Sequence, residues 1–191
     1  MKQKIILAST SPRRQELLKQ IGLDFEVIPS SFEEDMTQKI SNTNLAKILA
    51  YGKAKNVADK IKNGVVIGSD TFIVFAGKRI GKPKNKEIAQ KSLRMISGNW
   101  VSIYSGIAII DTKNKRELTD YEITKVKIKS LTKKEIDDYI ATGEPLDKAG
   151  AFAIQGRGAI FIEKINGCYS NVVGLPLYKL YINLQKFGIN I

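Results

Sequence analysis

Asp70 is the carboxylate of this sequence that is best placed for acid–base or metal chemistry. It follows the apolar run 65–67 and lies within Gly68-Ser69-Asp70-Thr71, which we predict to be a tight turn before a second strand at 72–75. Catalytic groups often project from such strand ends, and a carboxylate held there can bind a hard cation. An aspartate that only caps its own turn would fit the same local sequence.

A cluster of hydroxyl groups and arginines near the start of the sequence could bind an anion. An apolar run stops at a hydroxyl cluster with Ser9 and Ser11, and Pro12, Arg13 and Arg14 follow. We predict a strand, a tight loop and a helix that begins at Pro12, with Ser11 as its N-cap. The free N–H groups of that helix end, together with Ser9 and the two guanidinium groups, could bind an oligophosphate. A capped helix with solvated arginines is the alternative, and this stretch alone does not decide between them.

The composition excludes several kinds of active site. The chain has no histidine, which removes Ser–His and Cys–His catalysis and the usual imidazole zinc sites. The single cysteine, Cys168, has no partner for an internal disulfide, as expected in a reducing compartment. Gly81-Lys82 lacks the other residues of a Walker loop, and Gly156-Arg157-Gly158 lacks the third glycine of a dinucleotide fingerprint. A general base must therefore be a carboxylate, a lysine or a metal-bound water.

Other charged side chains recur near the predicted loop ends. The cations are Arg13, Arg14, Lys53, Lys82 and Lys148, and the carboxylates are Glu33, Glu34 and Asp70. If these groups gather in space, they form a metal-assisted phosphate site, because cations stabilise phosphate charge and carboxylates hold a divalent metal. Their spacing in the chain does not show whether they gather.

The elements that must position these groups alternate between strands and helices. After the first helix we predict a strand at 25–28, a loop at 29–42 and a helix at 44–64. Farther along we predict a hairpin turn at 77–78, a helix at 86–96 and strands at 101–110 and 118–130. The remaining elements are a short helix capped by Thr132, a glycine-rich segment at 149–158, a strand at 159–165 and a last helix at 176–187. This order mixes βα units with antiparallel hairpins, which predicts an α/β fold with a mixed sheet.

Length and charge set limits on the class of protein. We predict one domain over residues 1–191, which is long enough for two tightly joined lobes and shows no linker. The net charge of +12 comes mostly from scattered lysines, so we do not expect nucleic acid as the principal ligand. No apolar run is long enough for a signal peptide or a membrane span, and we expect a cytoplasmic protein without a membrane partner.

Several motifs, in order, resemble the Maf family of nucleoside triphosphate pyrophosphatases. Residues 7–14 are similar to the N-terminal signature of that family, and Gly68-Ser69-Asp70-Thr71 is similar to its acidic turn, with Ser69 where alanine is usual. Further similar segments are Lys82-Pro83, Ser97-Gly98, residues 147–156 and residues 171–177. The resemblance spans nearly the whole chain. It implies an α/β fold with an elongated mixed β-sheet flanked by helices and a cleft between two lobes, shared with inosine triphosphate pyrophosphatases.

The resemblance also implies roles for single residues. Segment 148–156 is similar to the subgroup that acts on dTTP and UTP, whereas relatives that act on 7-methyl-GTP carry an acidic residue in place of Gln155. Arg13, Thr71 and Gln155 would then be specificity positions, and Asp70 would be the proton acceptor. The other polar positions of the family pocket are matched by Ser9, Arg14, Glu33, Lys53 and Lys82.

Members of the family commonly form homodimers and use a divalent metal. The resemblance therefore implies Mg²⁺ or Mn²⁺ held by Asp70 with Glu33 or Glu34, and hydrolysis of a nucleoside triphosphate to the monophosphate and pyrophosphate. Two alternatives remain open. One is a preference for 7-methyl-GTP or inosine-type nucleotides. The other is a non-catalytic regulator of cell division that binds nucleotides or nucleic acid, since family members have been linked to septum formation.

The sequence departs from the family pattern at two positions. Val101 stands where a histidine often follows the Ser-Gly pair, which suggests that this histidine is not essential to the chemistry. Gly52 precedes Lys53 where a glutamate is common. The second departure removes a possible carboxylate ligand and weakens the transfer of family roles around Lys53.

Overall fold

The computed structural model describes residues 3–191, which form two compact units. Unit 1 contains the chain up to Thr71, together with Ser105–Glu122 and Gly174–Ile191. Unit 2 contains Phe72–Tyr104 and Ile123–Val173. The division falls inside strands, so single strands contribute residues to both units.

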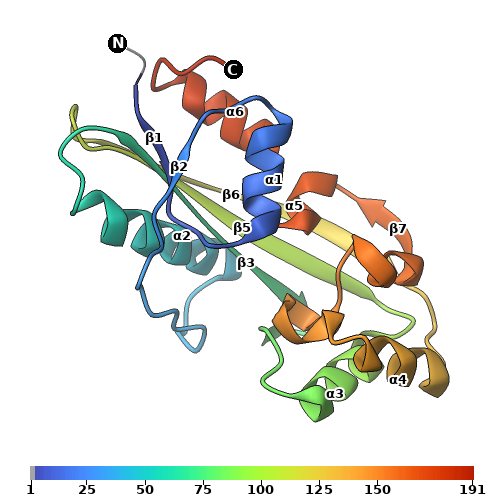
Figure 1. The fold of residues 1–191 in the computed structure, drawn as a ribbon. Helices are drawn as coiled ribbons and strands as arrows, with labels where there is room; N and C mark the ends of the chain where they lie inside the picture. The colour runs from blue at the N-terminus through green and yellow to red at the C-terminus, as the bar shows by residue number, and fades with distance from the viewer. Residues whose placement is uncertain (1–2) are drawn as a thin grey trace. The chain divides into compact units, whose positions relative to one another are not determined.

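The strands form a mixed sheet, which in the described residues has seven members and is flanked by helices (Figure 1). Its long strands are β3 (Val65–Phe75), β5 (Trp100–Asp111) and β6 (Arg116–Ile128). Parallel and antiparallel pairs both occur, which confirms the predicted α/β class with a mixed sheet.

Unit 1 contains the parallel part of the sheet. Strand β1 (Ile5–Leu7) pairs with β2 (Glu26–Val27) on one side and with β3 on the other, where Leu7 faces Ile67. The helices of this unit are α1 (Pro12–Gln20), α2 (Asn42–Ala58) and α6 (Leu177–Gln185). Strand residues such as Ile6 and Val66 pack against alanines of α2 and form its core.

Unit 2 is built from antiparallel hairpins and short helices. Strand β4 (Lys78–Ile80) pairs with β3, and β7 (Ile162–Asn166) pairs with β6. The helices are α3 (Lys86–Ile96), α4 (Lys133–Ala141) and α5 (Tyr169–Val173), and 3₁₀ turns occupy Glu144–Asp147, Ala149–Ala151 and Gly156–Phe161. Its own core includes Leu93 and Ile96 of α3 with Val126 of β6.

Local sequence signals place several helix ends correctly. Helix α1 begins at Pro12 after Ser11, although the Ser11 side chain makes no capping hydrogen bond. Thr132 and Glu135 form a capping box at the start of α4. Helix α2 ends at Ala58 rather than at residue 64, and Ile61 packs on the same core from the turn that follows. The apolar periodicity therefore continues past the true helix end.

The predicted turn at Gly68-Ser69-Asp70-Thr71 is wrong. Strand β3 runs without interruption from Val65 to Phe75. A Cβ atom built on Gly68 would lie 2.3 Å from the carbonyl oxygen of Ala50 in α2. Gly68 therefore permits the close approach of a helix, which is a second common reason for glycine in a strand.

A second glycine brings α2 equally close to β5. A Cβ atom on Gly106 would lie 1.8 Å from the carbonyl oxygen of Ala46. Ala46, Ala50 and Ala54, at intervals of four, are all fully buried. Because the close contacts of both glycines involve backbone atoms, rotation of a side chain cannot relieve them. This packing fixes the distance between α2 and the sheet. It therefore also fixes the position of Lys53, which lies on α2.

The predicted strand at 159–165 is correct only from Ile162. The preceding residues, Gly156–Phe161, form a 3₁₀ turn in which Gly156 has a φ of +68°. This left-handed value favours glycine and interrupts extended structure. Within residues 3–191, no helix combines the length and the hydrophobicity that crossing a bilayer requires.

Candidate active site

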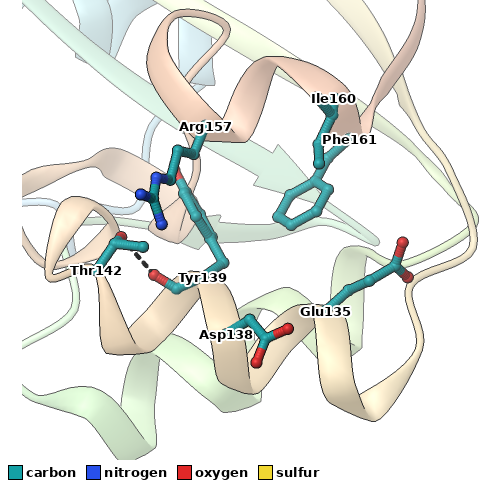
Figure 2. Close-up of a pocket in the computed structure, with 7 residues that line it drawn as sticks. All are labelled: Glu135, Asp138, Tyr139, Thr142, Arg157, Ile160 and Phe161. Carbon is teal, nitrogen blue, oxygen red and sulfur yellow. Dashed lines mark hydrogen bonds between the residues drawn. The ribbon is translucent and has the colours of Figure 1, made fainter.

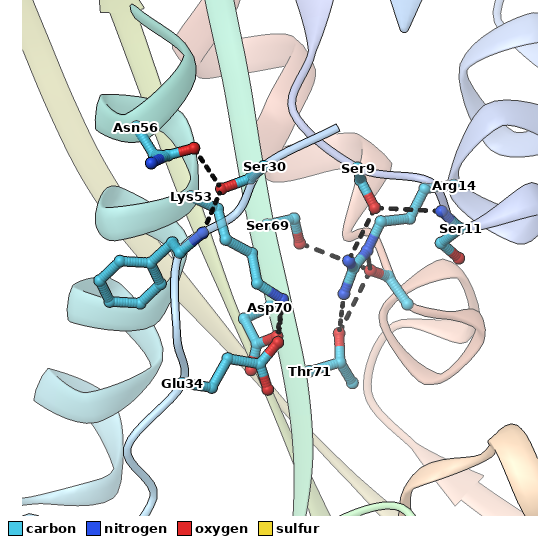
Figure 3. Close-up of polar contacts among 12 residues, drawn as sticks. Ser9, Ser11, Arg14, Ser30, Glu34, Lys53, Asn56, Ser69, Asp70 and Thr71 are labelled. Carbon is cyan, nitrogen blue, oxygen red and sulfur yellow. Dashed lines mark hydrogen bonds and ion pairs between the residues drawn. The ribbon is translucent and has the colours of Figure 1, made fainter. Parts of the chain in front are cut away.

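Arg14 is the centre of a first polar cluster in unit 1. Its Nε donates to the carbonyl oxygen of Gly174 at 2.9 Å, and its terminal nitrogens donate to Ser9 Oγ and to Thr71 Oγ1, each at 3.2 Å (Figure 3). Ser9 lies in the loop between β1 and α1, and Arg14 lies in the first turns of α1. One guanidinium group therefore joins the end of β1, the strand β3 and the segment that leads to α6.

The environment of Arg14 suits an incoming anion. The side chain is only 8% exposed, and the three acceptors that it contacts are neutral oxygens. Burial lowers the pKa of Arg14, while the charges of Asp70 and Glu34 oppose that effect and the charge of Arg13 adds to it. Arginine stays protonated under all these influences. A buried guanidinium held by neutral acceptors attracts an oxyanion strongly, because water screens it poorly.

Lys53 is the centre of a second cluster. Its ammonium group forms ion pairs with Asp70 and, at 2.5 Å, with Glu34 (Figure 3). The Asp70 side chain is 7% exposed, whereas that of Glu34 is 42% exposed. Lys53 lies on α2 three residues after Ala50, and Asp70 lies on β3 two residues after Gly68. The contact of Ala50 with Gly68 therefore brings Lys53 to Asp70.

Both clusters involve the same stretch of β3. Side chains alternate along a strand, so Asp70 lies on the face toward α2 and Thr71 lies on the opposite face, toward Arg14. The parallel pairing with β1 ends where Leu7 faces Ile67, so β1 does not cover this stretch. The structure brings together Ser9, Arg14 and Thr71 on one face of β3, and Glu34, Lys53 and Asp70 on the other.

The carboxylates of Asp70 and Glu34 fit a divalent cation that is held jointly with a substrate. Both reach the same ammonium group, so they lie close to each other. Sites for Mg²⁺ at phosphates commonly use one or two carboxylates, and water and phosphate oxygens complete the coordination. Residues 3–191 contain no group of three or more His, Cys, Asp or Glu side chains that could hold a metal ion. Asp70 and Glu34 are therefore the two carboxylates that this site could offer to a cation.

Arg13 and Glu33 lie beside these contacts rather than within them. Arg13 is half-buried on α1 and adds positive charge near Arg14. Glu33 is exposed in the loop between β2 and α2. The sequence left open whether Glu33 or Glu34 accompanies Asp70, and the structure places Glu34 on the lysine that Asp70 also binds.

Lys82 and Gln155 belong to unit 2. Lys82 is exposed in the segment after β4, and Gln155 is half-buried immediately before the 3₁₀ turn Gly156–Phe161. The amide of Gly150 donates to the carbonyl oxygen of Gly81 at 3.0 Å. This hydrogen bond joins the segment of Lys82 to the glycine-rich segment that carries Gln155.

Glu144 holds the start of the same 3₁₀ turn. Its carboxylate accepts hydrogen bonds from the amides of Arg157 and Gly158, at 3.0 and 3.1 Å, and from Tyr139 Oη at 2.8 Å. Burial by itself would raise the pKa of the Glu144 carboxyl, but the hydrogen bonds from Arg157, Tyr139 and Gly158 outweigh it and lower that pKa. No local sequence signal indicates this role, because two of the three donors are backbone amides of distant residues.

Replacing Glu144 with glutamine is expected to lower the free energy of unfolding at pH 7 by about 1–3 kcal/mol, since an amide oxygen replaces a charged acceptor. The folded-state pKa of Glu144 is lowered, so its stabilisation is present above the unfolded value of about 4.3 and is lost as the pH falls through the folded value. Urea unfolding at pH 7 and near pH 3 measures both effects, and the difference from wild type should shrink at the lower pH. Glu163→Gln, at an exposed position of β7, is the matched control. An equal difference at both pH values would contradict the expectation.

A separate hollow of about 270 Å³ lies in unit 2 between α4 and the 3₁₀ turn Gly156–Phe161 (Figure 2). It is lined by Glu135, Asp138, Tyr139, Thr142, Arg157, Ile160 and Phe161. The aromatic rings of Tyr139 and Phe161 meet edge to face, with centroids 5.0 Å apart. One cation and two carboxylates line this hollow, so it lacks the excess positive charge that a phosphate site needs.

Two groups of the Arg14 cluster were not predicted from the sequence. The carbonyl oxygen of Gly174 accepts hydrogen bonds from Arg14 and from Thr71 Oγ1, the latter at 3.2 Å. Ser105 Oγ lies 2.8 Å from Thr71 Oγ1. A backbone carbonyl has no residue-type signal, and Ser105 resembles any other polar residue of a strand. Only the resemblance of residues 171–177 to a family motif pointed to the region of Gly174.

Comparison with known proteins assigns the chain to a family. A family model described as "Maf-like protein" matches residues 4–187. The chain belongs to the Maf-like protein family. This confirms the resemblance that the ordered motifs indicated.

Curated relatives of this Maf-like chain carry the name dTTP/UTP pyrophosphatase. The protein of Acetivibrio thermocellus is 49% identical, with 98% of this chain and 97% of that protein covered. The protein of Clostridium botulinum is also 49% identical, with 98% of each chain covered. The protein of Caldicellulosiruptor bescii is 48% identical, with 98% of this chain and 96% of that protein covered.

Two solved structures resemble the chain at low sequence identity. The Staphylococcus aureus Ham1 protein is 19% identical, with a TM-score of 0.46, 66% of this chain and 72% of that chain covered. Protein VC0702 from Vibrio cholerae is 11% identical, with a TM-score of 0.41, 97% of this chain and 99% of that chain covered.

Proposed function

We propose that this Maf-like chain is a nucleoside triphosphate pyrophosphatase that hydrolyses dTTP and UTP to the monophosphate and pyrophosphate. The observation that carries the proposal is the arrangement on β3: a buried guanidinium group on one face, and two carboxylates held by one ammonium group on the other. Such an arrangement can bind phosphate charge and accept a proton next to it. The curated relatives named dTTP/UTP pyrophosphatase support the same substrates.

Asp70 is the proton acceptor in the proposed reaction. A water molecule attacks the α-phosphorus, its proton passes to Asp70, the bond from that phosphorus to the bridging oxygen breaks, and pyrophosphate leaves. Asp70 is 5% exposed, which keeps its carboxylate in a fixed orientation. A divalent cation such as Mg²⁺ or Mn²⁺, when bound by Asp70 and Glu34, would supply charge neutralisation to the phosphate oxygens.

The cations of the site stabilise the charge that moves onto the leaving group. Arg14 is held by three acceptors before a substrate arrives, so little orientational freedom is lost when a phosphate binds. Lys53 supplies a second positive charge beside Asp70. We assign Arg13 and Lys82 as further phosphate-binding residues because they match polar positions of the family pocket.

Base selection is assigned to Arg13, Thr71 and Gln155. The assignment follows from the family resemblance, and the chemistry of Gln155 supports it, because its amide offers both a donor and an acceptor to the edge of uracil or thymine. A base with another pattern would leave a buried partner without its hydrogen bond, which is a strong source of discrimination.

The purified protein is expected to release pyrophosphate from dTTP and UTP when Mg²⁺ or Mn²⁺ is present, and to lose this activity when a chelator is added. A panel that includes 7-methyl-GTP and ITP, followed with a pyrophosphate assay, measures both effects. A preference for either of those two nucleotides would overturn the assigned bases. If no nucleotide yields pyrophosphate and the protein instead binds DNA or RNA in a salt-sensitive manner, it is a binding protein and not an enzyme.

We further propose that the protein acts in the cytoplasm as a homodimer, and that residues 1–191 form a single domain of two lobes. The single cysteine suits a reducing compartment. The family resemblance supports dimerisation, and light scattering of the purified protein measures it. The match of one family model to residues 4–187 supports a single domain.

A further inference from the structure

The loop between β2 and α2 is attached to α2 by groups that belong to neither cluster. Asn56 Oδ1 accepts hydrogen bonds from Ser31 N at 3.0 Å and from Ser31 Oγ at 3.2 Å. It also accepts one from Ser30 Oγ at 3.3 Å (Figure 3). Ser30 Oγ in turn accepts a hydrogen bond from Phe32 N at 3.2 Å. A single side chain of α2 therefore holds the loop at residues 30–32.

The ring of Phe32 occupies the space directly above Gly52. A Cβ atom built on Gly52 would lie 2.3 Å from Cζ and 2.4 Å from Cε2 of that ring. Gly52 and Asn56 are four residues apart, so they lie on the same side of α2. The loop thus runs along the helix toward its N-terminus, first past Asn56 and then past Gly52. Gly52 is also a position at which the sequence departs from the family pattern.

These contacts limit where Glu34 can lie. Glu34 follows Phe32 by two residues and pairs with Lys53, the neighbour of Gly52. Its side chain is 42% exposed. An ion pair of such an exposed group contributes little by itself, because water competes for both charges. The docked backbone of Ser31 and Phe32 is therefore the main restraint on the position of the Glu34 carboxylate.

We propose that Phe32, Gly52 and Asn56 are positioning residues that hold Glu34 beside Asp70. They touch no reacting atom and act through the loop. The proposal rests on the proposed function, because it treats Glu34 and Asp70 as parts of one site. Phe32 and Gly52 form a matched pair, in which the ring fills the space that a side chain at position 52 would need.

Gly52→Ala places a methyl group where the Phe32 ring lies, so the ring must move, and we expect the loop that carries it to shift with it. The expected result is a fall of about 10- to 100-fold in kcat/KM for dTTP, the scale that a displacement of about 1 Å produces. The thermal midpoint should stay at or above that of wild type, because the ring can move and alanine favours a helix more than glycine does. Adding Phe32→Val makes room for the methyl group and should recover part of the activity.

A double-mutant cycle with Glu34→Gln distinguishes positioning from a general effect on the fold. If Gly52 acts through Glu34, then Gly52→Ala lowers kcat/KM in wild type but causes no further loss in the Glu34→Gln protein. An equal fold-change in both backgrounds would overturn the proposal. Lys55→Ala, on the same helix with a 44% exposed side chain, is the control for changes in α2.

Amide hydrogen exchange separates this proposal from the proposed function. If wild type releases no pyrophosphate from dTTP or UTP, the proposed function fails, but the docking of the loop can still be measured. Gly52→Ala should then accelerate exchange at residues 31–34, including the Phe32 amide that donates to Ser30. Unchanged exchange at those residues would overturn the positioning role whatever the activity of the protein.

Discussion

Asp70→Asn is expected to lower kcat for dTTP by roughly three orders of magnitude or more, because one carboxylate serves both as proton acceptor and as cation ligand. Asparagine has nearly the same shape, and Lys53 keeps its ion pair with Glu34, so the protein should remain folded. Steady-state assays at saturating nucleotide and metal measure the loss, and thermal unfolding followed by circular dichroism measures the fold.

The control for the loss of charge is Asp59→Asn. Asp59 pairs with Lys55 just beyond α2, and its side chain is 60% exposed. Its replacement should leave kcat unchanged. If Asp70→Asn retained near wild-type kcat with metal present, Asp70 could not be the proton acceptor, and the assignment of this carboxylate would fall.

Arg14→Lys is expected to lower kcat/KM for dTTP by about 100- to 1,000-fold, the effect of removing a fixed cationic donor from a site of developing charge. Lysine keeps the positive charge but lacks the planar fork of arginine. Its donors all lie on one nitrogen, so it does not reproduce the three spaced nitrogens with which Arg14 donates to Ser9, Thr71 and Gly174. The same steady-state assay measures the change.

Lys19→Met is the matched control for this variant, because Lys19 is an exposed cation of the same helix. It should leave kcat/KM within about twofold of wild type, as for a solvated charge outside the site. If Arg14→Lys behaved like Lys19→Met, then Arg14 would be a buried structural residue that joins α1 to β3. The assignment of Arg14 as a phosphate-binding residue would then be wrong.

Sequence signals that extend over only a few residues predicted most of the helices and strands. The capping box at Thr132 and the proline at the start of α1 mark helix ends by local hydrogen bonding and fixed φ, and both ends were predicted correctly. The turn assigned to Gly68 was wrong because the same residue serves two needs: freedom of φ in a turn, and close packing under a helix. Only the position of α2, which the local sequence does not contain, decides between them.

The residues of the candidate site were predicted from the sequence, but their arrangement in space was not. Residue types showed that arginines and carboxylates suited to phosphate were present, and the family resemblance assigned them to one pocket. The structure adds that Asp70 and Thr71, adjacent in sequence, serve opposite faces of β3. It also adds the carbonyl of Gly174, 160 residues from Arg14, which no spacing rule could have found.

The alanines of α2 pack directly on Gly68 and Gly106, and this packing affects how mutational scans of the protein should be interpreted. Neither glycine carries a functional group, yet a side chain at either would lift the helix that holds Lys53, Gly52 and Asn56. A screen that scores only turnover would rank both positions with Asp70. A parallel screen for soluble, folded protein would distinguish positions that tolerate no change because of packing, such as the two glycines, from positions that tolerate none because of chemistry, such as Asp70. Efforts to alter nucleotide preference by redesign should therefore leave these two glycines unchanged and vary residues that face the base.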